Sequence, residues 1–182
     1  MSAKALKLFS KKFKADIIDT HNRLGNETAI VKKDNIHAMC LALRDEPKLA
    51  FDYMSDLTVV DYAERQPRFE VVYNLYSMTL KHRIRLRAIV EEGDEKIASV
   101  CDIWRAANWA EREAWDMYGI DFEGHPELRR MLMYEEFEGH PLRKDYPIQK
   151  SQPRMDLRRP ERDAVEEYKH FHVAGNRSDD AR

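Results

Sequence analysis

Apolar residues near the start of the chain follow a helical spacing. Between lysines, they fall at Leu6, Phe9, Phe13 and Ile17. This spacing predicts an amphipathic first helix, but the position of its end is open. Ile17 either continues that helix or opens a short strand that pairs with residues 27–33 across the turn sequence Leu24-Gly25-Asn26.

The next stretch predicts a second helix and three strands. Asp34 is of a residue type that caps helix N-termini, and Pro47 marks the helix end. The apolar face of this helix holds Ile36, Met39, Cys40 and Leu43. Runs rich in β-branched and aromatic residues predict strands at Leu57–Tyr62, Phe69–Met78 and Arg83–Val90. We therefore expect an α+β fold with a small, mixed, largely antiparallel sheet packed with helices.

The last of these strands alternates strictly between basic and apolar residues. Arg83, Arg85 and Arg87 alternate with Ile84, Leu86 and Ala88. Such a pattern buries one face of a strand and leaves the other basic. A basic row is typical of a solvated sheet face, and the alternative is a docking surface for an acidic partner.

A third helix is predicted from Asn108. Asn108 is followed by Glu three positions later, as in a capping box, and Gly119 is of the type that ends a helix after Tyr118. Arg112 and Asp116 are four apart and form a potential ion pair within the helix. Because a surface pair of this kind contributes only about 0.5 kcal/mol, we favour a buried, partner-facing ion network for this charge-dense helix.

The pentapeptide Phe-Glu-Gly-His-Pro occurs twice, at residues 122–126 and 137–141. Proline suits the first turn of a helix, so the first copy predicts a short helix over residues 127–133. The inward face of this helix is expected to hold Leu128, Met131 and Leu132. The second copy leads to one turn at most over residues 142–146, because Pro147 follows. Residues after the third helix are therefore expected to be rich in loops.

The two repeated histidines, His125 and His140, have three interpretations: structural hydrogen bonding in turns, metal binding and proton handling. Helical zinc pairs use spacings such as His-x-x-x-His, whereas these two are 15 residues apart with no cysteine nearby. Structural hydrogen bonding to backbone groups is therefore favoured. Glu111, Glu113 and Asp116 lack a nucleophile or cofactor loop beside them, so no catalytic, cofactor-binding or metal site is predicted.

Composition narrows the class of protein. Charged residues make up 35% of the 182 positions, mean hydropathy is −0.71 and net charge is −2, which suits one water-soluble domain and disfavours nucleic-acid binding. The sequence has no Gly-x-Gly-x-x-Gly or Gly-x-Ser-x-Gly motif, and its two cysteines are far apart. The expected domain covers residues 1–150, and residues 151–182 form an extended or partly disordered tail, either ordered along a neighbour or unattached.

The chain is expected to stay in the cytoplasm and not to cross a membrane. Its longest apolar runs are a few residues, far short of the roughly 20 needed to span a bilayer. The N-terminal residues lack the apolar core of a secretory signal and the arginines of a mitochondrial presequence, so a mitochondrial location is less favoured.

Residues 111–147, EREAWDMYGIDFEGHPELRRMLMYEEFEGHPLRKDYP, resemble a characteristic segment of the C subunit of NADH-quinone oxidoreductase, in the respiratory complex I family. The resemblance extends upstream to about Lys14 and includes FDYMSDLTVVDY at residues 51–62 and Ala-Asn-Trp at residues 107–109. Tyr118 and Tyr146 stand where members often carry Phe, Trp115 occupies a variable position, and the tail follows no family pattern.

This resemblance implies a non-catalytic subunit of the peripheral arm of a proton-translocating NADH:quinone oxidoreductase. It implies docking to the quinone-site D subunit, with the B and I subunits nearby, at the cytoplasmic face of the bacterial inner membrane. NAD(H), FMN, iron-sulfur clusters and quinone would be carried by other subunits. Two alternatives are an equivalent scaffold subunit of a membrane-bound hydrogenase or other-donor dehydrogenase, and a free-standing metalloenzyme using the two histidines.

We expect the charge-dense segment to form the subunit interface. In this hypothesis its charges pair with a partner and its large aromatic residues act as anchors. The interface candidates are Trp109, Glu111, Arg112, Glu113, Trp115, Asp116, Tyr118, His125, Arg129, Arg130, His140, Arg143, Lys144 and Asp145. The hypothesis predicts that Arg143→Ala reduces assembled complex while the isolated chain stays folded.

Overall fold

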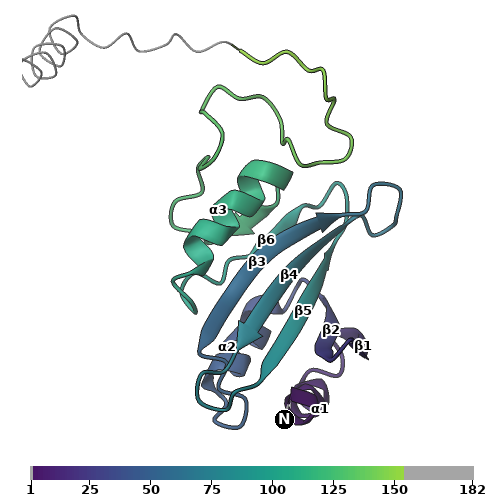
Figure 1. The fold of residues 1–182 in the computed structure, drawn as a ribbon, viewed down its shortest axis with the longest axis vertical. Helices are drawn as coiled ribbons and strands as arrows, with labels where there is room; N and C mark the ends of the chain where they lie inside the picture. The colour runs from purple at the N-terminus through teal and green to yellow at the C-terminus, as the bar shows by residue number, and fades with distance from the viewer. Residues whose placement is uncertain (1, 154–182) are drawn as a thin grey trace, which may run out of the picture. The chain divides into compact units, whose positions relative to one another are not determined.

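A five-stranded sheet forms the centre of the fold, in the order β1-β2-β5-β4-β3 (Figure 1). Its strands are β1 (Ile17–Arg23), β2 (Asn26–Lys32), β3 (Tyr53–Asp61), β4 (Phe69–Tyr76) and β5 (Arg83–Val90). Every neighbouring pair is antiparallel except β2 and β5, which are parallel. The predicted α+β fold with a mixed, largely antiparallel sheet is therefore confirmed.

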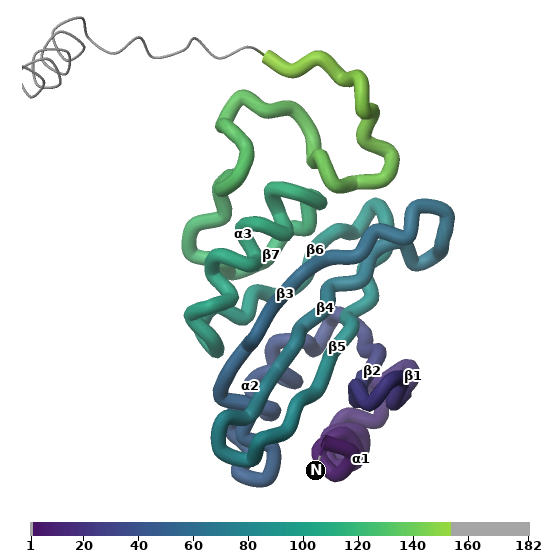
Figure 2. Tube along the Cα trace, in the orientation of Figure 1, coloured from purple at the N-terminus to yellow at the C-terminus, as the bar shows by residue number. Residues whose placement is uncertain are grey.

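The computed structural model describes residues 2–153, so the predicted tail lies outside the described residues apart from positions 151–153. The helices are α1 (Ser2–Lys12), α2 (Ile36–Asp45) and α3 (Ala107–Tyr118). Figure 2 shows α2 behind the sheet and α3 alongside β3. Strands β6 (Lys96–Ala98) and β7 (Asp121–Glu123) form a small parallel pair that the sequence did not predict.

Strand alternation decides which face of the sheet meets the helices. In β5, Leu86 is fully buried and lies in register with Ala29 of β2 and Tyr73 of β4, which are also buried. These residues join one apolar core with the inward faces of α1 and α2, including Phe9 and Met39. The arginines of β5 therefore lie on the opposite face, as alternation requires.

The predicted hairpin is confirmed, and the first helix is shorter than its apolar spacing allows. Ile17 opens β1 and pairs with Val31 of β2. Leu24 and Gly25 connect the strands, both with positive φ (56° and 75°), as tight hairpin turns require. The turn therefore accounts for the register that places Val31 in the core.

The expected N-cap of the second helix is wrong, whereas its end is confirmed. Asn35, not Asp34, occupies the cap position, and its side chain makes no capping bond. Its amide instead donates to the Asp16 carboxylate at 3.0 Å, because that acceptor lies within reach across the β1 entry. The helix ends at Asp45, two residues before Pro47.

A long segment after β7, residues 124–150, contains neither helix nor strand. The predicted helix over residues 127–133 is therefore wrong, and Leu132, expected inside, is 54% exposed. Among residues 2–153, none of the helices combines the length and apolar character needed to cross a bilayer.

Candidate subunit interface around helix α3

The buried carboxylate of Asp116 organises the segment that follows β7. Its Oδ2 atom accepts the backbone N–H groups of Met131, Leu132 and Met133 at 3.0, 2.8 and 2.9 Å. Its Oδ1 atom accepts from Arg130 Nη1 at 2.6 Å. These N–H groups point at one carboxylate instead of along a helix axis, which explains why the predicted helix is absent.

Asp116 carries its charge because those donors outweigh burial. Burial raises the pKa of the carboxyl, but the hydrogen bonds from Met133, Arg130, Leu132 and Met131 bring the pKa below its usual value. The expected pair between Arg112 and Asp116 is wrong. Arg112 donates to the backbone oxygens of Arg129 and Arg130, at 3.3 and 3.4 Å.

Arg130 connects α3 to the second pentapeptide. Besides Asp116, its Nη2 atom donates to the backbone oxygens of Phe137 at 2.6 Å and Gly139 at 3.2 Å. Its guanidinium also lies 5.7 Å from the ring centre of Trp115 and 5.6 Å from that of Phe137. One arginine therefore holds residues 137–139 against the helix.

The second pentapeptide packs against the end of α3. Gly119 ends the helix with φ of 76°, and a Cβ there would lie 2.6 Å from the His140 ring. His140 Nδ1 donates to the Asp116 backbone oxygen at 3.0 Å, and Arg143 Nε donates to that of Tyr118 at 2.5 Å. Burial, with the charges of Arg143 and Arg130, lowers the pKa of His140 and favours the neutral ring.

A buried ion pair outside the predicted site joins this segment to the central sheet. Arg68 donates to both oxygens of Asp61 at 2.9 Å and pairs with Asp145 at 2.9 Å. The Lys144 N–H also donates to Asp61, at 2.8 Å. Burial alone raises the pKa of Asp61, but the bonds from Arg68, Lys144 and Ala63 lower it to about 2. Charged residues near a strand end give no sequence signal of such burial, so this pair was not predicted.

Glu111 forms a second buried cluster at the other side of α3. Its carboxylate accepts from Ser99 Oγ at 2.6 Å, the Val100 N–H at 2.8 Å and Cys101 Sγ at 3.1 Å. The predicted capping box is therefore wrong: helix α3 begins at Ala107, and the Glu111 side chain turns to residues 99–101. Burial raises the pKa of Glu111, although these hydrogen bonds act against that effect.

His125 lies beside this cluster and ties two backbone groups together. Its Nδ1 accepts the Glu127 N–H at 3.0 Å and its Nε2 donates to the Asn108 oxygen at 3.1 Å. Together with the His140 bond, this confirms that both histidines hold backbone groups in turns.

Ligand atoms of Cys101, Glu111 and His125 lie within 4.8 Å of one another. Burial, with the Glu111 hydrogen bond, raises the pKa of the Cys101 thiol to about 12, so the thiol keeps its proton and donates a hydrogen bond to Glu111. Each of the three side chains also already has a protein partner. The trio is therefore built as a hydrogen-bonded cluster that a metal ion would have to break.

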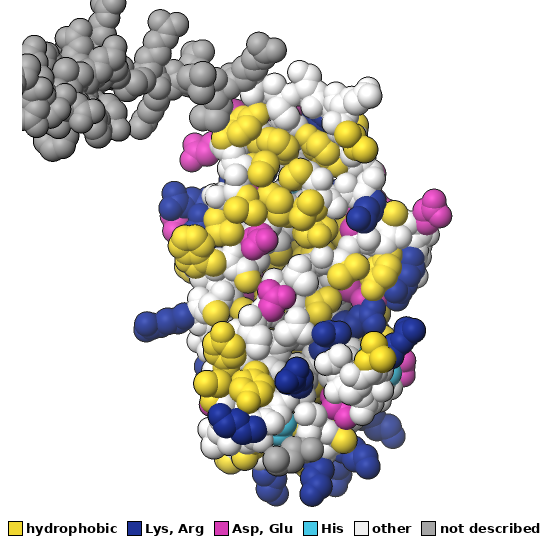
Figure 3. Space-filling view, in the orientation of Figure 1, with side chains coloured by type: hydrophobic (Ala, Val, Ile, Leu, Met, Phe, Trp, Pro, Cys, Tyr) yellow, Lys and Arg dark blue, Asp and Glu magenta, His cyan; other side chains and the backbone are white. Residues whose placement is uncertain are grey.

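The outer surface of this region is apolar. Figure 3 shows hydrophobic side chains gathered over α3 and the segment after β7. Trp109 is 66% exposed, and Leu132 and Leu142 are about half exposed. These three residues define what we call the apolar patch. Exposed apolar side chains gathered on one face are typical of a protein-binding site.

The predicted interface residues thus separate into two groups. Eight use their side chains in hydrogen bonds or ion pairs to other parts of the chain: Glu111, Arg112, Asp116, His125, Arg130, His140, Arg143 and Asp145. Trp109, Glu113, Arg129 and the Lys144 side chain are at the surface, and Trp115 and Tyr118 are partly buried. Leu132 was missed because it was expected on the inward face of a helix over residues 127–133, and Leu142 was not singled out.

Comparison with known proteins gives the family. A model of the family described as "Respiratory-chain NADH dehydrogenase, 30 Kd subunit" matches residues 29–152. The chain belongs to this family. The C subunit of the NADH-quinone oxidoreductase of Geotalea uraniireducens is 48% identical over 139 residues, covering 76% of this chain and 84% of the relative. The C 2 subunit of the Rhizobium meliloti enzyme is 50% identical over 118 residues, covering 65% and 64%.

Solved structures share the fold. A trypsin-resistant fragment of Nqo5 superposes with a TM-score of 0.60 at 28% identity, covering 70% of this chain and 100% of the fragment. A chain of an archaeal membrane-bound sulfane sulfur reductase has a TM-score of 0.64 at 22% identity, covering 81% and 86%. This member of the 30 Kd subunit family is thus a subunit of a respiratory enzyme complex.

Proposed function

We propose that this chain is a structural, non-catalytic subunit in the peripheral arm of a proton-translocating NADH:quinone oxidoreductase. It docks the quinone-site D subunit, with the B and I subunits nearby, on the cytoplasmic side of the membrane. NAD(H), FMN, iron-sulfur clusters and quinone are held by the other subunits. The family membership supports the complex, and the apolar patch supports the docking role.

One observation carries this proposal: an exposed apolar surface lies on a segment that buried charges hold in place. Trp109 is exposed on α3. Leu132 is exposed in the segment after β7, where its own N–H group and that of Met131 donate to Asp116. A preorganised surface loses less entropy on binding, so contacts made there contribute more to affinity. The buried charges therefore serve the interface by shaping it, and the apolar patch supplies the contact.

We propose a different role for the charges of the segment than in the sequence-based hypothesis, in which they pair with a partner, because several of them have partners within the chain. Arg143 already pairs with Glu95 at 3.5 Å and donates to the Tyr118 oxygen. Glu113 and Arg129 are exposed, and Arg129 meets Glu127 at 3.0 Å. We propose that Glu113, Arg129 and the Lys144 amine contribute rim contacts, which influence association rate more than affinity.

The alternative is an equivalent scaffold subunit of a membrane-bound hydrogenase or other-donor dehydrogenase. The chain shares its fold with a chain of the sulfane sulfur reductase complex, which is compatible with this alternative. At 22% identity, this similarity is evidence for the fold alone. Electron-donor identity belongs to other subunits, so this chain's geometry is the same in both cases.

Affinity purification from native membranes through a tagged copy of the chain tests the proposal. We expect the quinone-site D subunit to be the most tightly retained partner, together with the B and I subunits and the NADH-oxidising flavoprotein. Recovery of hydrogenase or other-donor subunits in place of the flavoprotein would favour the alternative. Recovery of the chain with none of these proteins, from membranes whose complexes remain intact, would overturn both.

A further inference from the structure

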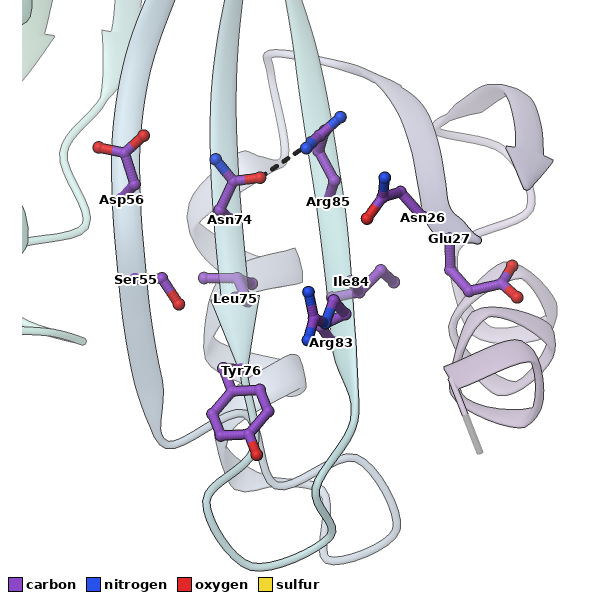
Figure 4. A pocket seen from close by; sticks show the side chains of 10 residues that line it. All are labelled: Asn26, Glu27, Ser55, Asp56, Asn74, Leu75, Tyr76, Arg83, Ile84 and Arg85. Atoms are coloured by element: carbon purple, nitrogen blue, oxygen red, sulfur yellow. Dashed lines mark hydrogen bonds between the residues drawn. The ribbon is translucent and has the colours of Figure 1, made fainter. Parts of the chain in front are cut away.

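The sheet face opposite the helices has a hollow of about 420 Å³ across β3, β4 and β5 (Figure 4). Strand register places its polar side chains together, because Arg85 of β5 lies opposite Asn74 of β4, and Asn74 lies opposite Asp56 of β3. Arg83 pairs with Tyr76 one step along the strands. Neighbouring residues in register share a face, so these side chains line one surface.

Two of the three arginines of β5 retain their capacity to bind an anion. Arg87 is used within the chain, since it pairs with Glu70 and donates to Tyr62 Oη at 2.8 Å. Among residues 2–153, Arg85 meets only a neutral amide, through Nε to Asn74 Oδ1 at 2.9 Å. Arg83 is exposed, and its guanidinium has no hydrogen-bond or ion-pair partner among residues 2–153.

Acidic residues at the hollow do not neutralise both arginines. Glu27 is buried, accepts from Asn22 at 2.7 Å and points toward α1 in Figure 4. Asp56 is thus the one carboxylate among the described lining residues that faces the hollow. A site with two guanidiniums and one carboxylate favours an added negative charge.

The rim of the hollow is aromatic and apolar. Tyr53 pairs with Tyr76 and is 50% exposed, and Met78, just after β4, is 52% exposed. Tyrosine, methionine and arginine are enriched where proteins bind each other. A free inorganic anion makes no use of such a rim, whereas a polypeptide segment can cover it.

We propose that this hollow binds an acidic segment of a neighbouring subunit. Its carboxylates pair with Arg83 and Arg85, and its chain lies across Tyr53 and Tyr76. This inference rests on the proposed function, because the partner is a subunit of the same complex. It assigns a second contact surface on the sheet, separate in sequence from the apolar patch.

Zero-length cross-linking in the purified complex tests this contact. Carbodiimide joins an amine to a carboxylate in direct contact, so R83K and R85K each place a reactive amine in the hollow. Mass spectrometry is expected to find an amide bond from position 83 or 85 to an Asp or Glu of another subunit. R87K is the matched control, because its carboxylate is Glu70 and its cross-link should stay within the chain.

A variant that retains its partner subunits but gives no cross-link from position 83 or 85 to another subunit would overturn this inference and leave the proposed function standing. A cross-link only to a protein outside the oxidoreductase would overturn this inference as well, because the proposed partner is a subunit of the same complex, and it would also count against the proposed function.

A second measurement uses the full isolated chain and a hexaglutamate peptide at low salt. The R83A/R85A double variant is expected to bind the peptide at least tenfold more weakly than the parent. R44A is the control, because Arg44 is on α2 and is paired with Asp45. Equal affinity in the double variant, or binding of inorganic phosphate as tight as that of the peptide, would contradict the inference.

Discussion

At the scale of single residues, buried charges determine the shape of the segment after β7. Asp116 is fully buried yet ionised, because four donors surround it. Asp61 is likewise held by Arg68 and two backbone N–H groups. Removing one member of such a pair leaves the other charge or donor without its partner, which costs more than the pair itself contributes.

Asp116→Asn is expected to destabilise the chain by about 3 kcal/mol, as measured by urea unfolding. The new amide group has two N–H donors of its own, and one would face Arg130 in place of an oxygen. Glu113→Gln is the control and should change the unfolding free energy by less than about 0.5 kcal/mol, because Glu113 is exposed. Equal stability of the two variants would refute the organising role of Asp116.

The free energy of unfolding should also depend on pH, because Asp61 has a lowered pKa in the folded chain. Its pKa is about 2 in the folded chain against 3.8 for the free side chain, so the folded state favours the ionised form. This contribution is complete above about pH 5 and is lost as pH falls from 3.8 toward 2, by about 2 kcal/mol. Urea unfolding of Asp61→Asn at pH 5 and pH 2 should show the variant losing less stability over that range than the parent. A parallel loss in both would contradict this assignment.

At the scale of elements, the end of α3 fixes the position of the second pentapeptide. Gly119 has left-handed backbone geometry and leaves room for the His140 ring. Its N–H group donates to the Trp115 oxygen at 2.8 Å, which closes the helix. The helix end and the pentapeptide therefore depend on the same glycine.

Gly119→Ala is expected to lower the melting temperature more than Gly93→Ala. Both positions have positive φ, which costs about 1 kcal/mol for alanine. Only position 119 adds a clash, with His140 ring atoms 2.6 Å from the new Cβ, whereas nothing lies within 4 Å at position 93. Hydrogen exchange should also show faster exchange in residues 139–146 of the Gly119 variant. Similar melting of both variants would mean that the pentapeptide does not pack there.

Elements with long alternating or helical patterns could be predicted from sequence. Residues 83–90 were placed without error, because the first six positions alternate strictly between basic and apolar residues. Strands β6 and β7 were missed, since three residues carry too short a pattern. The predicted helix over residues 127–133 failed because Asp116 competes for its N–H groups, and no local pattern records a distant acceptor.

The candidate site was predicted in part. The bonding of His125 and His140 followed from their turn sequences. The pairing of Arg68 with Asp61 and Asp145 could not be predicted, because it depends on how a later segment returns to β3.

At the scale of the whole molecule, buried charges hold the chain in shape, and the exposed apolar surface is available for binding. Residues 124–150 have no regular secondary structure, and ion pairs and hydrogen bonds hold them in place. The apolar patch lies at the surface of α3 and of these residues, and Trp109 on α3 is its most exposed member. The account therefore predicts that truncating the patch impairs assembly while leaving the chain's own stability nearly unchanged.

The most direct test is retention of partner subunits by tagged Trp109→Ala chain after purification from native membranes. A large aromatic anchor contributes about 2 kcal/mol or more at an interface, so we expect at least a tenfold loss of the retained quinone-site D subunit. Leu8→Ala, an exposed position on α1, is the matched control and should retain it fully. The unfolding free energy of the isolated variant should change by less than about 1 kcal/mol, because Trp109 is largely exposed and its contact with Arg112 is a weak cation–π interaction. Full retention of the quinone-site D subunit by a stable Trp109→Ala chain would contradict the central claim.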